Sequence, residues 1–306
     1  MNTKQLRNTL LLMGCSFIWG TAFVAQSVGG GYMGAYTFLA GRSWLACVFL
    51  LGLMGARRAN QRRKGVRVPF FLQRKTLAVG GLCCGTALFA ASVAQQMGIP
   101  GTTTAKAGFL TALYVVLVPV CGIFAGRRPD AKLCCCVTAS VAGLYLLCLA
   151  GHGTLSLSGS EWLLLLCALL FTGQILLVNH FSPKLDGIQL SFAQFFVVSV
   201  LSTVGMFLFE QPTAQQFRDA AVSILYCGIM SSGVAYTLQI EGQKDLDPTI
   251  ASLAMCLESV FSALAGWLIL HQTLTPTELT GCALMFAAIV ASQLPSKKRR
   301  GTTAQE

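Results

Sequence analysis

One carboxylate, Glu258, stands near the centre of an apolar segment that spans residues 248–270 and carries no other formal charge. As an α-helix this segment has the length of one membrane crossing. Glu258 then lies roughly 15 Å from its start, near the middle of a hydrocarbon layer of about 30 Å. A carboxylate at that depth costs a few kcal/mol, so it must face water, a cation or a bound proton. Glu258 is therefore a candidate to bind a substrate ammonium group or a proton. The alternative is a structural carboxyl, protonated or bonded to a neighbouring helix, that only supports packing.

A cation at membrane depth, Arg42, complements this carboxylate. A carrier of zwitterions needs one cation and one anion across a cavity, and the planar guanidinium fork of Arg42 matches a substrate carboxylate. Two other roles remain open: Arg42 and Glu258 pair with each other, or Arg42 extends outward to the membrane surface as an anchor. Lys106 lies only about one helical turn from the start of its segment, within reach of the interface, and is a weaker candidate.

Aromatic and amide side chains complete the candidate site. Trp19 lies in the middle of the first apolar segment and Tyr114 in the fourth. Their polar tips need a partner when buried, and a cavity supplies one, although packing alone is the alternative for both. Pro119 interrupts the fourth segment and frees a backbone carbonyl, as a hinge or as a tolerated kink. The expected substrate-binding residues are Trp19, Arg42, Gln95, Tyr114, Gln174 and Glu258.

The composition places these residues in a membrane protein. Hydrophobic residues make up 54% of the 306 residues and charged residues only 11%, well below the roughly 25% charged fraction of soluble domains. The 13 cysteines lie in apolar runs and form neither a disulfide framework nor a metal-ligand spacing. No Walker motif is present, and the three histidines accompany neither Glu258 nor a serine nucleophile in a recognisable spacing. We therefore expect no ATP-driven pumping, no enzymatic activity and no cofactor.

Apolar windows bounded by glycine, proline or charge predict an all-α protein with ten transmembrane helices. The first window follows Lys4 and Arg7 as in a signal sequence, but its apolar run continues to Val28. That run is too long for a cleaved signal, so we expect an uncleaved first helix. The predicted helices span residues 7–28, 36–55, 76–97, 104–125, 132–150, 161–181, 188–209, 219–240, 248–270 and 277–294.

The distribution of positive charge predicts the orientation. A net charge of +11 is also typical of nucleic-acid-binding proteins, but 19 of the 22 lysine and arginine residues fall on the side of the membrane that holds both termini. The positive-inside rule therefore predicts cytoplasmic N- and C-termini and an outer loop at residues 152–160. We expect the most basic connection, residues 56–75, to be a cytoplasmic loop that meets anionic lipid headgroups rather than nucleic acid.

An internal repeat divides the chain. An offset of 144 superposes the third and fourth helices on the eighth and ninth and pairs Tyr114 with Glu258. An offset of 152 superposes Trp19 on Phe171. Each copy holds five helices, an odd number, so the second copy enters the membrane from the opposite side. We expect residues 1–150 and 151–300 to be inverted repeats with substrate bound between them near the midplane. The identical pairs at offset 144 are Cys83 and Cys227, Gln95 and Gln239, Gly98 and Gly242, Ala107 and Ala251, Leu113 and Leu257, and Gly122 and Gly266.

Several short motifs, in this order and in a ten-helix frame, resemble those of an EamA-type domain of the drug/metabolite transporter superfamily. They are residues 14–20, Arg42 with Trp44 and Leu45, and residues 95–119; the second half repeats the pattern through Tyr236, Ala251, Glu258, Gly266 and Trp267. The resemblance covers residues 6–294. Two positions depart from it: Glu258 is followed by Ser259 where many relatives have proline, and the same helix ends in His271-Gln272 where many have Gly-Glu.

The resemblance implies a secondary transporter of the cytoplasmic membrane that exports or exchanges small metabolites, often amino acids or related compounds. Its substrate would bind in a central cavity and move by alternating access, with a proton as a candidate coupling ion. The two departures leave the substrate charge and the coupling mechanism open. A membrane-embedded enzyme and a non-transporting scaffold or channel remain as the other classes. The sequence determines neither the substrate nor the oligomeric state.

Overall fold

The computed structural model describes residues 3–64, 71–124, 126, 131–148, 158–271 and 275–293. These residues are helical, as predicted, and the predicted membrane-protein fold is confirmed. Among these residues, eight helical spans are long and apolar enough to cross a membrane, and two shorter apolar helices, within α6 and α14, join them. The expected outer loop at 152–160 lies mostly outside the described residues. The helices of the first half are α1 (Thr3–Gly30), α2 (Ala35–Arg63), α3 (Arg74–Gly98), α4 (Thr104–Ala112), α5 (Tyr114–Phe124) and α6 (Ala131–Cys148).

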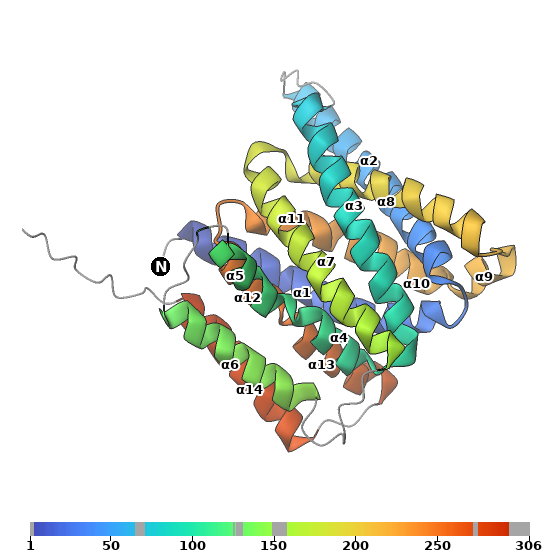
Figure 1. The fold of residues 1–306 in the computed structure, drawn as a ribbon. Helices are drawn as coiled ribbons and strands as arrows, with labels where there is room; N and C mark the ends of the chain where they lie inside the picture. Colours follow the sequence, from blue (N-terminus) through green and yellow to red (C-terminus); the bar gives the residue numbers. More distant parts are fainter. Residues whose placement is uncertain are drawn as a thin grey trace, which may run out of the picture.

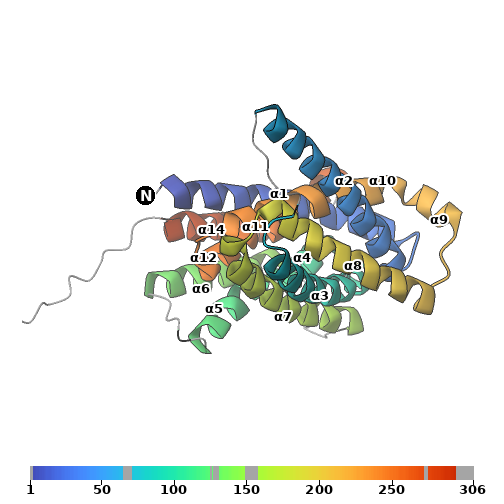
Figure 2. The same cartoon turned by 90° about the horizontal axis from the view of Figure 1, so that it is seen from above.

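The second half repeats this order. Its elements are α7 (Gly159–Phe181), α8 (Gly187–Phe209), the short α9 (Ala214–Asp219), α10 (Ala221–Leu225), the π-helix η3 (Tyr226–Ala235), α11 (Tyr236–Gln243), α12 (Pro248–Met255), α13 (Glu258–Leu270) and α14 (Pro276–Gln293). Here α10, η3 and α11 together make one crossing, α4 and α5 make another, and α12 and α13 a third. In Figure 1, α6 and α14 lie side by side at one edge of the bundle, and α2, α3 and α8 form the opposite edge. Figure 2 shows the same grouping from above.

The two halves meet as repeats of opposite direction. The half-helix α4 packs against α13, and α5 packs against α12, two contacts that a pseudo-twofold axis exchanges. Helices α2 and α8 form another such pair. They touch at Cys47 and Ser199, 152 residues apart, whose Sγ and Oγ atoms are 3.5 Å from each other. This contact places the pseudo-twofold axis at the middle of both helices.

Two predicted helices, residues 104–125 and 248–270, are each broken in the middle, which corrects the expectation of continuous spans. The first breaks at Leu113 and the second at residues 256–257. Proline is not the common cause, because Pro119 lies inside α5, six residues past the first break, and the second segment has no proline there. One hydroxyl group, which also lies 2.8 Å from the Leu12 carbonyl of its own helix, reaches carbonyls near the second break. Ser16 Oγ on α1 lies 3.0 and 3.1 Å from the carbonyl oxygens of Ala254 and Met255.

The basic connection is also shorter than expected. Helix α2 does not stop at residue 55 but continues to Arg63, so the first part of the predicted loop at 56–75 is helical. Alanine, arginine and glutamine, which dominate this extension, have high helix propensity and need no apolar surroundings. Hydropathy alone therefore ended the helix too early.

Candidate functional site

A cavity lies at the centre of the bundle, between the two repeats. The space not occupied by atoms is about 440 Å³, but only about 30 Å³ of it can hold the centre of a water-sized sphere, which is room for one or two water molecules in this conformation. Both repeats contribute to its walls. The lining residues are Trp19, Phe23, Gln26, Arg42, Gln95, Thr111, Tyr114, Phe171, Ile175, Ser231, Tyr236, Gln239 and Glu258.

Repeat counterparts face one another across this cavity. At offset 152, Trp19 pairs with Phe171 and Phe23 with Ile175, and at offset 144 Gln95 pairs with Gln239 and Tyr114 with Glu258; all eight line the cavity. Such pairs meet only near the pseudo-twofold axis. The cavity therefore lies where the sequence repeat predicted a binding site, at the interface of the two halves.

The helix breaks place two polar residues in the cavity wall. Tyr114 is the first residue of α5, and Glu258 is the first residue of α13. The partial positive charge of a helix N-terminus favours a carboxylate at this position. Close packing holds it there: a Cβ atom on Gly20 of α1 would lie 2.8 Å from the Glu258 carbonyl oxygen and 2.4 Å from the Phe261 Cβ. Glycine at position 20 thus lets α1 approach the start of α13.

Arg42 enters the cavity from α2 and is only 4% exposed. Its Nη1 donates to the side-chain oxygen of Gln26 at 3.0 Å, and its guanidinium lies 5.9 Å from the centre of the Phe38 ring. Within the described residues Arg42 forms no ion pair with Glu258, the pairing that the sequence had left open. Its burial also separates it from the bundle surface. The cation and the carboxylate both line the cavity without neutralising each other by direct contact.

Aromatic rings form another wall. The rings of Trp19 and Tyr236 lie 4.7 Å apart between centroids, and the Phe195 ring lies 5.1 Å from that of Tyr236 at nearly a right angle. Such offset and edge-to-face contacts stabilise aromatic pairs and fix the ring orientations. The cavity therefore combines a rigid apolar surface with its charged groups.

Four polar atoms of the cavity residues form no well-oriented hydrogen bond within the described part of the chain, but two of them belong to Tyr114 and Glu258, whose side chains interact with each other. The four atoms are Trp19 Nε1, Arg42 Nε, Tyr114 Oη and Glu258 Oε1. A buried polar group without a partner costs about 1–3 kcal/mol, so Trp19 Nε1 and Arg42 Nε are best satisfied by something that enters the cavity. The two nitrogen atoms and the tyrosine hydroxyl can donate a hydrogen bond, and the carboxylate oxygen can accept one. This set suits a ligand that has both acceptors and donors.

The two predicted glutamines differ in their position. Gln95 lines the cavity and points its amide toward Thr111, with Nε2 and Oγ1 3.5 Å apart. Gln174 is fully buried behind the wall and exchanges hydrogen bonds of 3.1 and 3.4 Å with the lining residue Gln239. The structure thus brings five of the six expected residues to one cavity, with Gln174 behind it as a support of Gln239.

Sequence reasoning left several lining residues out of the expected site. Gln26 lies on the same face of α1 as Trp19, seven residues on, and Gln239 is the repeat counterpart of Gln95. Both signals were present in the sequence. Ser231 and Tyr236 lie in and directly after the π-helix η3, and nothing in the local sequence predicts its wider turns. π-Helical segments frequently occur at functional sites.

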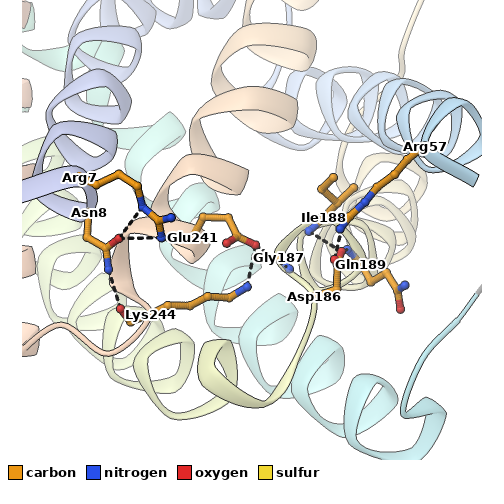
Figure 3. Close-up of polar contacts among 9 residues, drawn as sticks. All are labelled: Arg7, Asn8, Arg57, Asp186, Gly187, Ile188, Gln189, Glu241 and Lys244. Carbon is orange, nitrogen blue, oxygen red and sulfur yellow. Dashed lines mark hydrogen bonds and ion pairs between the residues drawn. The ribbon is translucent and has the colours of Figure 1, made fainter. Parts of the chain in front are cut away.

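Polar contacts between the repeats close the end of the bundle that carries the N-terminus. Figure 3 shows this network around α1, α2, α8 and α11. Asp186 accepts hydrogen bonds from the backbone N–H groups of Ile188 and Gln189 at the start of α8 and pairs with Arg57 of α2 at 2.7 Å. Asn8 Nδ2 of α1 donates to the Lys244 carbonyl at 2.7 Å. Each of these last two contacts joins one repeat to the other.

A second set of contacts closes the opposite end. Glu210, after α8, accepts from the backbone N–H groups of Tyr36 and Thr37 at 3.0 and 2.8 Å, and from the Thr37 hydroxyl. Lys106 of α4 forms an ion pair with Glu161 of α7. Lys106 therefore pairs near the helix end, away from the cavity. Both ends of the bundle carry polar contacts across the repeat interface, with the cavity between them.

No metal site accompanies the cavity in the described part of the chain. Groups of three or more histidine, cysteine, aspartate or glutamate side chains at ligand spacing are absent from those residues. The lining residues offer one carboxylate, amides, hydroxyls and a guanidinium. This set suits hydrogen bonding to an organic molecule better than coordination of a transition metal.

Comparisons with known proteins agree with this architecture. The solved crystal structure of another protein has a TM-score of 0.71 and 17% identity and covers 94% of this chain and 96% of its own; the likeness concerns the fold. An uncharacterized transporter of Archaeoglobus fulgidus is 26% identical over 295 residues, 95% of this chain and 87% of its own. The uncharacterized transporter YoaV of Bacillus subtilis is 26% identical over 166 residues, 52% of this chain and 57% of its own. The sequence profile of the EamA-like transporter family matches residues 7–149 and again residues 159–292, and the chain therefore belongs to this family.

Proposed function

We propose that this protein exports small zwitterionic metabolites, such as amino acids or related compounds, by alternating access. As a member of the EamA-like family it is a membrane transporter and not an enzyme. One observation supports the zwitterionic substrate most directly. Arg42 and Glu258 line the same cavity without pairing with each other; Arg42 Nε has no partner among the described residues, and the neighbour of Glu258 is the uncharged Tyr114. The family resemblance implies export or exchange, and export is the direction proposed for this protein.

Each side of the cavity then has a role in binding. Arg42, held by Gln26 at 3.0 Å, presents its guanidinium to the substrate carboxylate as a planar donor. Glu258, at the start of α13, accepts from the substrate ammonium group. The ring pair of Trp19 and Tyr236 contacts the apolar part of the substrate. In the absence of substrate a proton can occupy Glu258, which would couple transport to the proton gradient.

The repeats supply the moving parts. We propose that the units at residues 1–150 and 151–300 rock about the cavity and open the contacts at one end while those at the other persist. The contacts of Asp186 and Asn8 close one end, and those of Glu210 close the other. In the orientation that the basic residues favour, the end with the N-terminus is cytoplasmic.

Repeat symmetry also suggests how the site changes between states. Arg42 and Gln194 are counterparts at offset 152, but only Arg42 lines the cavity. Gln194 is fully buried, and both its amide atoms lack a partner within the described residues. When the repeats exchange conformations, Gln194 takes the place that Arg42 has here. We propose that it then contacts the substrate on its way out of the protein.

Counterflow in proteoliposomes tests this function. Vesicles loaded with one unlabelled amino acid at a time should accumulate the same labelled amino acid, with saturation, for at least one member of a panel of zwitterions. Glu258→Gln should lose the signal, and Asp219→Asn, which removes a carboxylate from the exposed helix α9, should keep it. Uptake of cationic, anionic and neutral compounds in preference to every zwitterion would contradict the proposal.

A further inference from the structure

A groove on the outside of the bundle runs between α3 and α8, separate from the central cavity. It has a volume of about 470 Å³ and is open toward the surroundings. Its lining is apolar except for one arginine. The lining residues are Phe71, Arg74, Leu77, Ala78, Gly81, Leu82, Phe192, Ala193, Phe196 and Val197.

Small residues make the floor of this groove. A Cβ atom on Gly81 would lie only 2.6 Å from the Ala193 Cβ, so α3 and α8 are in close contact there. Ala78, which also lines the groove, has a small side chain and leaves the space beside this helix contact unfilled. The groove is thus a consequence of the helix packing.

Aromatic rings make one wall. Phe71 and Phe192 have ring centroids 6.1 Å apart, and Phe192 and Phe196 repeat that spacing as a stacked pair. The Gln189 side chain accepts from the Leu72 backbone N–H at 2.9 Å and holds the segment before α3 against α8. The wall is therefore fixed in place by contacts of its own.

Arg74 gives one end of the groove its charge. It is the first residue of α3 and is exposed. Arg57 on α2 is paired with Asp186, but Arg74 forms no ion pair among the described residues. The apolar lining extends from Arg74 to Leu82, about 12 Å along the helix axis. A cation at the membrane surface and an apolar channel below it match the two parts of a phospholipid.

We propose that this groove binds one anionic phospholipid, with its phosphate on Arg74 and an acyl chain between α3 and α8. A zwitterionic lipid fits the apolar channel equally well but brings a choline or ethanolamine cation to the same place. The charge of Arg74 therefore selects lipids of net negative charge. This site does not depend on the identity of the transported substrate.

Native mass spectrometry of the intact, detergent-solubilised protein tests the site. After equal exposure to phosphatidylglycerol and phosphatidylcholine with identical acyl chains, the protein should retain one phosphatidylglycerol in preference to phosphatidylcholine. Arg74→Gln should lower this retention about fivefold, the effect of one basic residue near a membrane surface. Lys75→Gln, which removes the adjacent charge outside the groove lining, is the matched control and should change it less.

A second pair of variants tests the apolar part without altering charge. Ala78→Trp fills the groove and should reduce retention of the bound lipid, whereas Val79→Trp, on the outward face of α3 and not in the lining, should not. Equal retention of both lipids, or equal effects of Arg74→Gln and Lys75→Gln, would overturn the proposal in favour of nonspecific surface attraction. If Ala78→Trp does not yield folded protein, the comparison of Arg74→Gln with Lys75→Gln decides whether the proposal holds.

Discussion

Tyr114 and Glu258 occupy equivalent places in the two repeats: each is the first residue after a helix break, and each lines the central cavity. A phenol in one repeat therefore stands where the other repeat has a carboxylate. The architecture is symmetric, but the chemistry at its centre is not. This asymmetry supports a substrate whose two ends differ in charge.

Replacement of Glu258 tests the role of the carboxylate. Glu258→Gln keeps the shape of the side chain and its place at the start of α13 but removes the charge. Loss of one partner in a desolvated charge pair costs at least about 2 kcal/mol, so we expect affinity for a zwitterion to fall about 30-fold or more. Isothermal titration with the substrate identified by counterflow measures this change. Unchanged affinity and transport at normal membrane abundance would show that Glu258 only supports packing.

Replacement of Arg42 tests the opposite end of the cavity. Arg42→Lys preserves the positive charge but loses the planar fork and the bond to Gln26, so transport should fall. Gln26→Leu, which leaves the guanidinium intact but unsupported, should have a smaller effect in the same direction. The ratio of initial rates under saturating and limiting substrate separates weaker binding from slower turnover. Transport by Arg42→Lys equal to that of the unmodified protein would contradict a direct role in binding.

Much of the fold follows from the sequence, because long apolar runs and the density of basic residues mark membrane crossings directly. The helix breaks, in contrast, do not follow from the sequence. At the second break the contact to Ala254 comes from Ser16, 238 residues away in the chain, and no local pattern in residues 248–270 predicts it. Hydropathy likewise missed the basic extension of α2 to Arg63, since helices outside the membrane need no apolar surface.

The candidate site divides in the same way. Charged residues at membrane depth are costly and thus stand out in the sequence, as Arg42 and Glu258 did. Neutral residues such as Ser231 and Tyr236 are common in membrane helices for other reasons. Their place in the cavity depends on the turn geometry of η3 and on which helices meet. Such information belongs to the tertiary structure.

Ser16 offers a test of the helix break itself. Ser16→Ala leaves the carbonyls of Ala254 and Met255 without their hydroxyl neighbour, in a fully buried position. We expect a loss of about 1–3 kcal/mol of stability, together with reduced transport because Glu258 is less firmly placed. Thr138→Ala is the control, since its hydroxyl bonds only the Cys134 carbonyl of its own helix. Equal melting temperatures for both variants in detergent would contradict this role of Ser16.

The orientation of the bundle is a separate prediction. Lys64, directly after α2, and Gln215, on α9, lie at opposite ends of the bundle. The distribution of basic residues predicts that Lys64 faces the cytoplasm and Gln215 the outside. Reporter fusions or accessible tags at these two positions should give opposite signals in intact cells. Signals of the same kind, or the reverse assignment, would contradict the predicted topology.

Gln194 provides the test of alternating access. Gln194→Leu removes a buried amide that has no partner in this state, so it should stabilise the protein by up to about 2 kcal/mol. We have proposed that the same amide contacts the substrate in the opposite state, so transport should fall although the protein is more stable. Gln243→Leu is the matched control: its amide is equally buried and unpartnered, but its repeat counterpart Ile99 does not line the cavity. We expect Gln243→Leu to stabilise the protein with little loss of transport. Thermal unfolding and counterflow on the same preparations measure both effects, and full transport by Gln194→Leu would show that this residue plays no part in the exchange of states.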